Sequence, residues 1–203
     1  MTTSTTHPQR RPAITAAGSG GPPTSAVSQQ GALVGQVIAD LARQRQPVAA
    51  NDGGAILRSV DRVLAGRKSR RSLTGARQAM ALFAAGYLRQ MMPPAGWQCL
   101  GAEIETAAGG RIDLVWRGPG DESAALVLFD ELKAQSIPTS QLLRGPAAAQ
   151  LDRYLAAGRT RFGARFIGVR LISLRHPADS LLLRADGAVQ PLGESSPFAE
   201  LGR

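Results

Sequence analysis

The chain has 203 residues, of which 43% are hydrophobic, and this length and apolar content suit one globular domain with extensions. Its single cysteine, Cys99, excludes an internal disulfide and a zinc site built from thiolates, and its two histidines, His7 and His176, argue against mechanisms that need a histidine pair. Catalytic chemistry would therefore rest on carboxylates, lysine, hydroxyls or backbone groups.

The formal net charge of +9 is concentrated in the N-terminal third of the chain. Residues 1–72 carry ten Lys+Arg and three Asp+Glu, whereas residues 73–203 carry fourteen and twelve. This asymmetry indicates a polyanionic partner, with nucleic acid favoured over a membrane surface; an arginine-rich source proteome is the alternative. Arginine is the default cation, and the only lysines are Lys68 and Lys133, so a lysine that ends an apolar strand looks selected for its chemistry.

Residues 1–30 predict a disordered tail, because Thr, Ser, Pro and Gly dominate and no apolar periodicity is present. This tail lacks the continuous apolar region of a secretory signal. No run in the chain is long enough to span a membrane, so we expect a soluble protein of the reducing cytoplasm, with no membrane partner.

Residues 31–72 predict a helical extension followed by a basic linker. Apolar residues at helical spacing indicate helices over residues 31–45 and 55–64, which Pro47 and Gly66 would end. Such helices can pair two copies of the chain or dock a protein partner. The densest basic cluster follows, and it fits either a phosphate-contacting segment or a solvated linker. Its cations are Arg67, Lys68, Arg70 and Arg71.

Residues 73–185 predict the main domain, and residues 186–203 an irregular tail. The expected elements are a helix, three strands, a second helix and a fourth strand, with a further short strand after them. Their ranges are 74–92, 98–106, 111–117, 124–133, 146–157, 162–174 and 181–183, and Gly158 would close the second of these helices. Short turns between the first three strands, followed by a helical crossover, imply an α/β fold with a mixed central sheet flanked by helices.

Charged side chains interrupt the third strand, where a buried strand would stay apolar. Glu131 and Lys133 are two residues apart, so both leave the strand on one face, and Asp113 on the preceding strand can lie beside Glu131. Two adjacent carboxylates repel each other unless a cation joins them, and magnesium suits such oxygen ligands. Lys133 would then contact a substrate phosphate or the attacking water.

Other groups near these acids extend the expected metal site. The backbone carbonyl of Leu132 can face the metal, and Glu103 on the first strand is preferred over Glu105 as an additional carboxylate. Asp130 points to the opposite face from Lys133 and is set aside as a ligand.

The helix over residues 146–157 carries Gln150 and Tyr154 four residues apart, and hence on one face. If this face looks at the acids, the pair can hold a phosphate and orient Lys133 or the water. Arg153 on the same helix is included among the residues expected to contact nucleic acid.

Three motifs follow one another along the chain: Asp113 on one strand, Glu131-x-Lys133 on the next, and Gln150-x-x-x-Tyr154 on the helix after it. This combination resembles the PD-(D/E)xK nuclease superfamily. The Gln-x-x-x-Tyr element is similar to that of the branch with RecB-type and lambda-exonuclease-type nucleases. The resemblance spans about residues 74–174. It implies a restriction-endonuclease-like core of order αβββαβ and hydrolysis of phosphodiester bonds with Mg²⁺ or Mn²⁺. It also implies a nucleic-acid substrate, for which DNA is favoured over RNA.

Two features depart from this pattern. The helix over residues 74–92 lacks the Glu or His that many relatives carry there, and Ile112 precedes the acid where proline is common. Three functions therefore stay open. They are an active nuclease, a catalytically silent nuclease-fold subunit of a larger assembly, and an unrelated α/β binding domain. In the last case the acids and lysine would form ordinary ion pairs, and Tyr154 would merely pack into the sheet.

Overall fold

The computed structural model describes residues 26–44, 48–65, 74–107, 109–135, 141, 143–144, 146–192 and 198. The basic cluster Arg67, Lys68, Arg70 and Arg71 lies outside these ranges. The helices are α1 (Ala26–Ala42), α2 (Gly53–Ala65), α3 (Thr74–Gln90) and α5 (Pro146–Phe162). The strands are β1 (Gln98–Glu105), β2 (Arg111–Arg117), β3 (Val127–Lys133), β4 (Phe166–Ser173), β5 (Leu181–Arg184) and β6 (Val189–Pro191).

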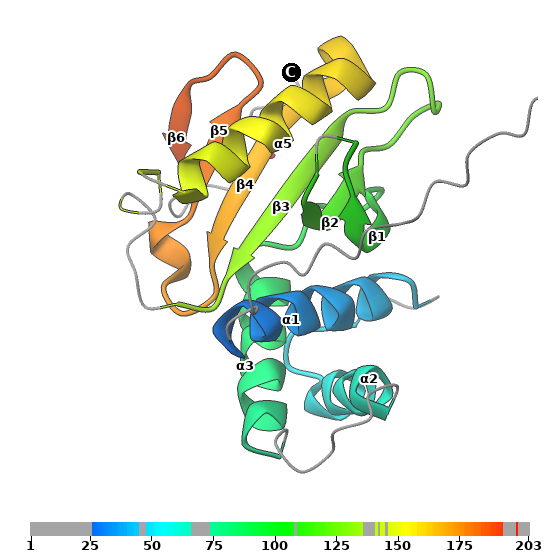
Figure 1. Cartoon of the computed structure of the whole chain (residues 1–203). Helices are drawn as coiled ribbons and strands as arrows, with labels where there is room; N and C mark the ends of the chain where they lie inside the picture. Colours follow the sequence, from blue (N-terminus) through cyan, green and yellow to red (C-terminus); the bar gives the residue numbers. More distant parts are fainter. Residues whose placement is uncertain are drawn as a thin grey trace, which may run out of the picture.

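The six strands form one mixed sheet in the order β1-β2-β3-β4-β5-β6 (Figure 1). Only β3 and β4 are parallel among these neighbours, and α5 makes the crossover that a parallel pair requires. The expected order of helix, three strands, helix and strand is thus confirmed, as is an α/β architecture with a mixed sheet flanked by helices.

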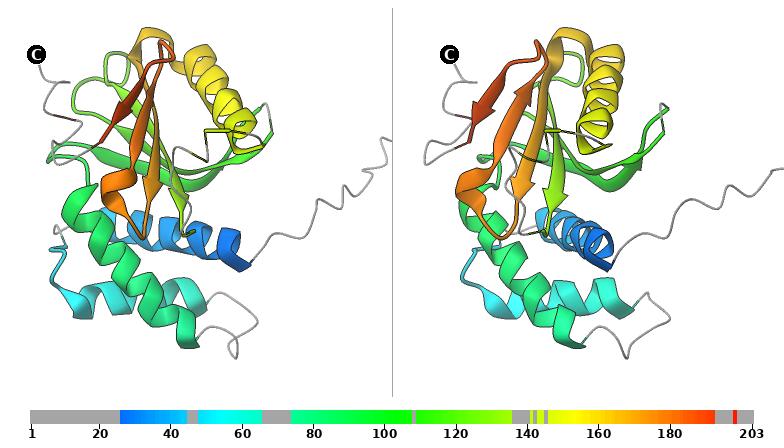
Figure 2. Two further views of the ribbon diagram at one scale, coloured as in Figure 1. Left: turned by 90° about the vertical axis from the view of Figure 1, so that its left-hand side faces the viewer. Right: turned by 60° about the vertical axis from the view of Figure 1, so that its left-hand side comes forward.

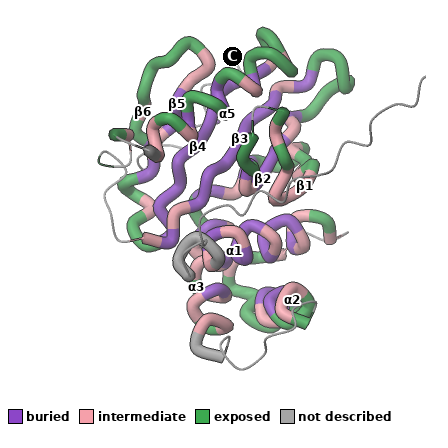
Figure 3. The backbone as a smooth tube through the Cα atoms, viewed as in Figure 1, coloured by how far each residue is buried: buried purple, intermediate pink, exposed green. Residues whose placement is uncertain are grey.

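Two hydrophobic clusters cover the two faces of the sheet. The first joins α1, α2 and α3 to Leu114, Leu128 and Ile172 of the sheet. The second joins α5 to the opposite face, through residues such as Phe129 and Val169. Figure 2 shows α5 on one side of the sheet and the three N-terminal helices gathered below it. The central strands β3 and β4 are buried almost throughout (Figure 3), as expected of parallel strands covered on both faces.

Helix α1 belongs to this core rather than to a separate extension. It begins at Ala26, so residues 26–30 are helical where the sequence predicted the tail to continue; alanine and glutamine are good helix formers there. Val34 and Val37 are fully buried in the cluster that contains Leu114 of the sheet. Among the described residues, no helix is both long and apolar enough to cross a membrane.

The predicted end of the second main helix, at Gly158, is wrong. Helix α5 continues to Phe162, and the chain leaves it at Gly163, whose φ of 57° lies in the left-handed region. Gly158 is a packing residue instead, because a Cβ atom placed there would lie 2.2 Å from the ring of Phe166. The expected fourth strand accordingly starts later, at Phe166. The irregular tail predicted from residue 186 also contains β6, which pairs with β5.

We expect Gly158→Ala to destabilise the protein by about 1–3 kcal/mol, the usual cost of overpacking a filled core. Gly86→Ala in α3 is the matched control, because its added Cβ would have no atom of the described residues within 4 Å apart from its own helix backbone and its chain neighbours. That change should stabilise the protein by about 0.5–1 kcal/mol, since alanine is the better helix former. Urea unfolding of both variants checks this, and a Gly158→Ala protein as stable as the original would show that Phe166 moves aside freely.

Candidate active site

Asp113 lies where the ladder between β2 and β3 ends. This ladder runs from the pair Arg117 and Val127 to the pair Leu114 and Asp130. Beyond it, Asp113 Oδ2 accepts a hydrogen bond of 2.6 Å from the backbone N–H of Leu132. A carboxylate thus takes the position of a backbone acceptor, which fixes Asp113 against the next strand.

Glu131 and Lys133 lie together at the end of β3. Their side chains are 5% and 18% exposed, and Lys133 Nζ donates to Glu131 Oε1 at 2.5 Å. The second oxygen, Glu131 Oε2, is buried and has no hydrogen-bond partner among the described residues. Glu131 is therefore half paired, and one oxygen is left to accept a further ligand.

Glu103 is the third acid of this cluster. The β1–β2 register shifts between Cys99 and Gly101, and Glu103 itself has a φ of 55°, so the simple alternation expected along β1 is broken. Its side chain is 13% exposed, with Oε2 3.3 Å from Arg111 Nη1. Glu103 Oε1 is buried and lacks a hydrogen-bond partner within the described part of the chain. Glu105, the alternative acid, is exposed.

The three carboxylates repel one another electrostatically. Burial, followed by the charge of Glu131, raises the pKa of Asp113 well above its ordinary value, and the charge of Glu103 adds to this effect. Burial also raises the pKa of Glu131, although the ammonium of Lys133 opposes the shift. The site would therefore gain stability from a cation.

Removing the charge of Asp113 should make the metal-free protein more stable. A carboxyl group whose pKa is raised by folding stabilises the protein fully below its unfolded pKa, and this contribution is lost as pH rises through the folded pKa. Asp113→Asn keeps an oxygen acceptor for Leu132 N–H but cannot ionise. With EDTA at pH 8, we expect its melting temperature to exceed that of the original protein by roughly 2–4 °C, equivalent to 1 kcal/mol in a domain of this size. Calorimetry should show the difference shrinking towards pH 4; a constant difference would contradict the electrostatic cause.

Helix α5 brings Gln150 and Tyr154 to the same region. Gln150 Nε2 donates to the Tyr154 hydroxyl at 2.7 Å, and this hydroxyl donates to the backbone carbonyl of Arg111 at 2.5 Å. Burial and the charges of Glu131 and Asp113 raise the pKa of Tyr154, so the phenol stays protonated. Tyr154 is fully buried, as it would be if it merely packed into the sheet of an unrelated binding domain. Gln150, however, is half-buried beside it. Arg153 is exposed on the same helix.

Helix α1 crosses the other side of this site at two glycines. A Cβ atom at Gly31 would lie 3.0 Å from the Leu132 carbonyl oxygen, and one at Gly35 would lie 3.3 Å from the Asp113 carbonyl oxygen. The helix backbone therefore packs closely against the ends of β2 and β3. The Leu132 carbonyl, expected to face a metal, lies against Gly31.

Sequence reasoning missed the polar network on the opposite face of β3. Asp130, correctly assigned to that face, is fully buried and forms an ion pair with Arg170 of β4 at 2.7 Å. Tyr87 and Trp116 also donate hydrogen bonds to Asp130. The sequence feature that could have revealed this network is Arg170, which lies inside the apolar run Phe166–Ser173. A buried guanidinium needs a buried partner.

Two other reactive side chains lie outside the acid cluster. Burial raises the pKa of the Cys99 thiol to about 11, which makes it a poor nucleophile. His176 is exposed after β4. Within the described ranges, no three His, Cys, Asp or Glu side chains are arranged to hold a metal ion by themselves. Comparisons with known family models, with curated proteins and with solved structures found no match.

Proposed function

We propose that this protein is a metal-dependent nuclease with a restriction-endonuclease-like core, which hydrolyses phosphodiester bonds of nucleic acid. One observation carries the proposal. Asp113, Glu131 and Lys133 meet at the end of the β2–β3 ladder, where buried carboxylate oxygens of Glu131 and Glu103 lack hydrogen-bond partners among the described residues. Buried polar atoms are nearly always satisfied, so these oxygens are suited to accept a bound cation or its waters.

The donor set fits Mg²⁺ or Mn²⁺. Magnesium is usually bound through one or two carboxylates, with waters and substrate phosphate completing its shell, so a three-residue protein cage is not required. Asp113 and Glu131 would hold the ion, with Glu103 beside them. The Leu132 carbonyl is the weaker candidate, because α1 packs against it at Gly31. When bound, such an ion polarises the phosphate and lowers the pKa of a coordinated water.

The remaining chemistry falls to Lys133 and to helix α5. Hydrolysis joins a water oxygen to phosphorus and breaks the ester bond, so negative charge develops on the phosphate and on the departing oxygen. Lys133, fixed by its ion pair with Glu131, is placed to stabilise this charge. Tyr154 holds Gln150 and the start of β2 in place through its two hydrogen bonds, and the Gln150 amide can orient a phosphate oxygen or water.

DNA is the preferred substrate in this proposal, and the cytoplasm the proposed compartment. The net charge of +9 favours a polyanion, and the exposed Arg153 immediately precedes Tyr154 on α5. The basic cluster between α2 and α3 would add phosphate contacts.

Cleavage under three metal conditions tests the proposal. End-labelled DNA and RNA, single-stranded and duplex, are incubated with the full chain in Mg²⁺, Mn²⁺ or EDTA. We expect cleavage with either metal, none in EDTA, and a higher melting temperature of the protein when Mg²⁺ is added. Cleavage that persists in EDTA, or no cleavage of any substrate, would contradict the proposal.

A silent nuclease-fold subunit is the second candidate, and the contact of α1 with the Leu132 carbonyl favours it. In that case the acids would bind no ion, and the chain would bind nucleic acid or a protein partner, or pair with a second copy through its N-terminal helices. The absence of any effect of Mg²⁺ on melting temperature, with nucleic-acid binding retained, would identify this case.

A further inference from the structure

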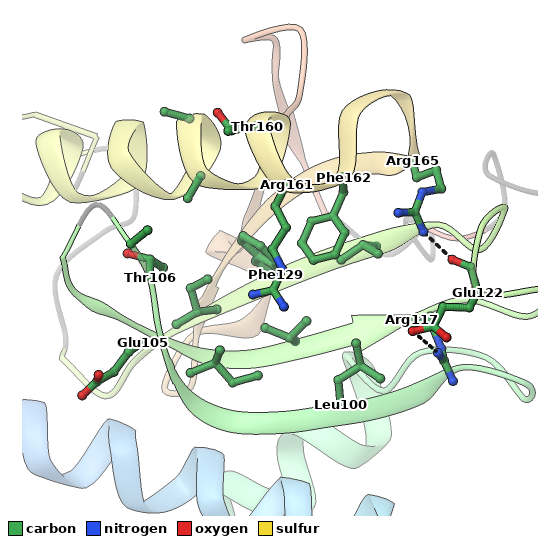
Figure 4. Close-up of a pocket in the computed structure, with 17 residues that line it drawn as sticks. Leu100, Glu105, Thr106, Arg117, Glu122, Phe129, Thr160, Arg161, Phe162 and Arg165 are labelled. Atoms are coloured by element: carbon green, nitrogen blue, oxygen red, sulfur yellow. Dashed lines mark hydrogen bonds and ion pairs between the residues drawn. The ribbon is translucent and has the colours of Figure 1, made fainter.

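A groove of about 720 Å³ lies between the β1–β2 hairpin and the C-terminal half of α5 (Figure 4). Its floor is apolar and includes Val127 and Phe129 of β3, with Ile112 of β2. Leu100 of β1 also lines it, although this leucine is 46% exposed. An exposed leucine beside a hydrophobic floor marks a surface suited to a partner rather than to water.

The groove lies on the same face of the sheet as the acid cluster. Along β3, the two-residue period places Val127 and Phe129 on the face that carries Glu131 and Lys133. Along α5, Arg161 follows Tyr154 by seven residues, two turns further on the same side of the helix. A chain lying in the groove would therefore run along both elements in the direction of the acid cluster.

Arginine side chains give the groove a cationic character. Figure 4 shows Arg161 reaching from α5 into the groove above Phe129. No carboxylate of the described residues forms an ion pair with Arg161, whose guanidinium lies 5.4 Å from the ring centre of Phe162. Arg165 lies 5.8 Å from the same ring. Cations beside aromatic rings can contact phosphates and bases together.

Acidic side chains only partly offset these cations. Arg117, at one end of the groove, is 3.8 Å from Glu122, whose side chain is 90% exposed. Glu105 lines the other end and points away from the middle of the groove (Figure 4). An anionic chain with apolar parts therefore fits the interior better than a neutral peptide does.

We infer that this groove binds an unpaired polynucleotide strand, with its bases over the apolar floor and its phosphates near Arg161. The inference rests on the proposed function and names its substrate class. Bases in a duplex are stacked inside and cannot reach such a floor, whereas unpaired bases can stack on aromatic side chains. A volume of 720 Å³ has the size of a small-ligand pocket, which suits one or two nucleotides.

Binding without cleavage tests this inference separately from catalysis. Fluorescence anisotropy in EDTA compares a labelled single-stranded 20-mer with the blunt duplex of the same sequence. We expect the single strand to bind at least about tenfold more tightly, in keeping with stacking of one base or more. Arg161→Ala and Leu100→Glu should each weaken single-strand binding by roughly five- to tenfold and leave duplex binding unchanged, since only unpaired bases reach the floor.

Arg159→Ala is the matched control, because Arg159 is exposed on the same helix but faces β5, where its Nε donates to the Ala185 carbonyl. It should bind both probes as the original protein does. Equal affinities for strand and duplex, or unchanged strand binding in both groove variants, would overturn the inference. Strand binding lost in the groove variants, in a protein that cleaves nothing with Mg²⁺, would support the groove and reject only the nuclease proposal.

Discussion

Lys133→Ala should lower the rate of Mg²⁺-dependent cleavage by about 10²–10³-fold, the usual loss when one group that stabilises transition-state charge is removed. The reason is local, since Lys133 is the cation paired with Glu131 at the end of β3. Single-turnover cleavage of the best substrate at saturating protein measures this loss as a change in rate rather than in binding. Arg184→Ala serves as the control, because Arg184 also ends a strand and is ion-paired, with Asp186.

Loss of Lys133 also leaves Glu131 buried without its partner, which would destabilise the fold. Asp113→Asn separates lost chemistry from lost stability, because in EDTA at pH 8 it is expected to be more stable than the original protein, and yet with Mg²⁺ to cleave at least about 10²-fold more slowly. A variant that gains stability and loses activity cannot owe that loss to unfolding. Full activity in both Lys133→Ala and Asp113→Asn would show that this site takes no part in cleavage.

Local patterns predicted the elements of the fold best where periodicity and turn residues agreed. Strand β2 has the expected bounds, Arg111–Arg117, because glycines flank it on both sides. The joint orientation of Glu131 and Lys133 followed from the two-residue strand period alone. Gly158 was misread as a helix end, because the ring of Phe166 that requires a glycine there comes from the following strand.

Long-range contacts explain the rest of the candidate site. Glu103 lies opposite Asp113, between the pairs Ala102–Leu114 and Ile104–Ile112, and no residue pattern predicts its left-handed φ. The approach of α1 depends on Gly31 packing against a carbonyl 101 residues later, at Leu132. Such features arise from packing between elements that lie far apart in the chain, so the sequence alone does not predict them.

Arg170→Met should cause the largest loss of stability of any substitution considered. Arg170 is fully buried, donates to both carboxylate oxygens of Asp130 at 2.7 Å, and donates to the Met91 carbonyl at 2.7 Å. Removing one partner of a buried ion pair costs about 3–5 kcal/mol, because the other charge stays buried without compensation. Tyr87 and Trp116 would remain as donors to Asp130 but carry no positive charge. A fall in melting temperature of roughly 10 °C follows for a domain of this size.

The double variant Asp130→Asn/Arg170→Met separates lost charge pairing from lost packing. Asparagine removes the orphaned charge and keeps an acceptor for Tyr87 and Trp116, so the double variant should be more stable than Arg170→Met alone by about 1–3 kcal/mol. Urea unfolding of the four proteins in this cycle measures the coupling, and a double variant less stable than Arg170→Met would contradict an electrostatic origin. Because Asp130 and Glu131 point to opposite faces of β3, cleavage assayed at 20 °C should change only a few-fold in the double variant. The buried pair would then support the fold of the strand that carries the site without taking part in its chemistry.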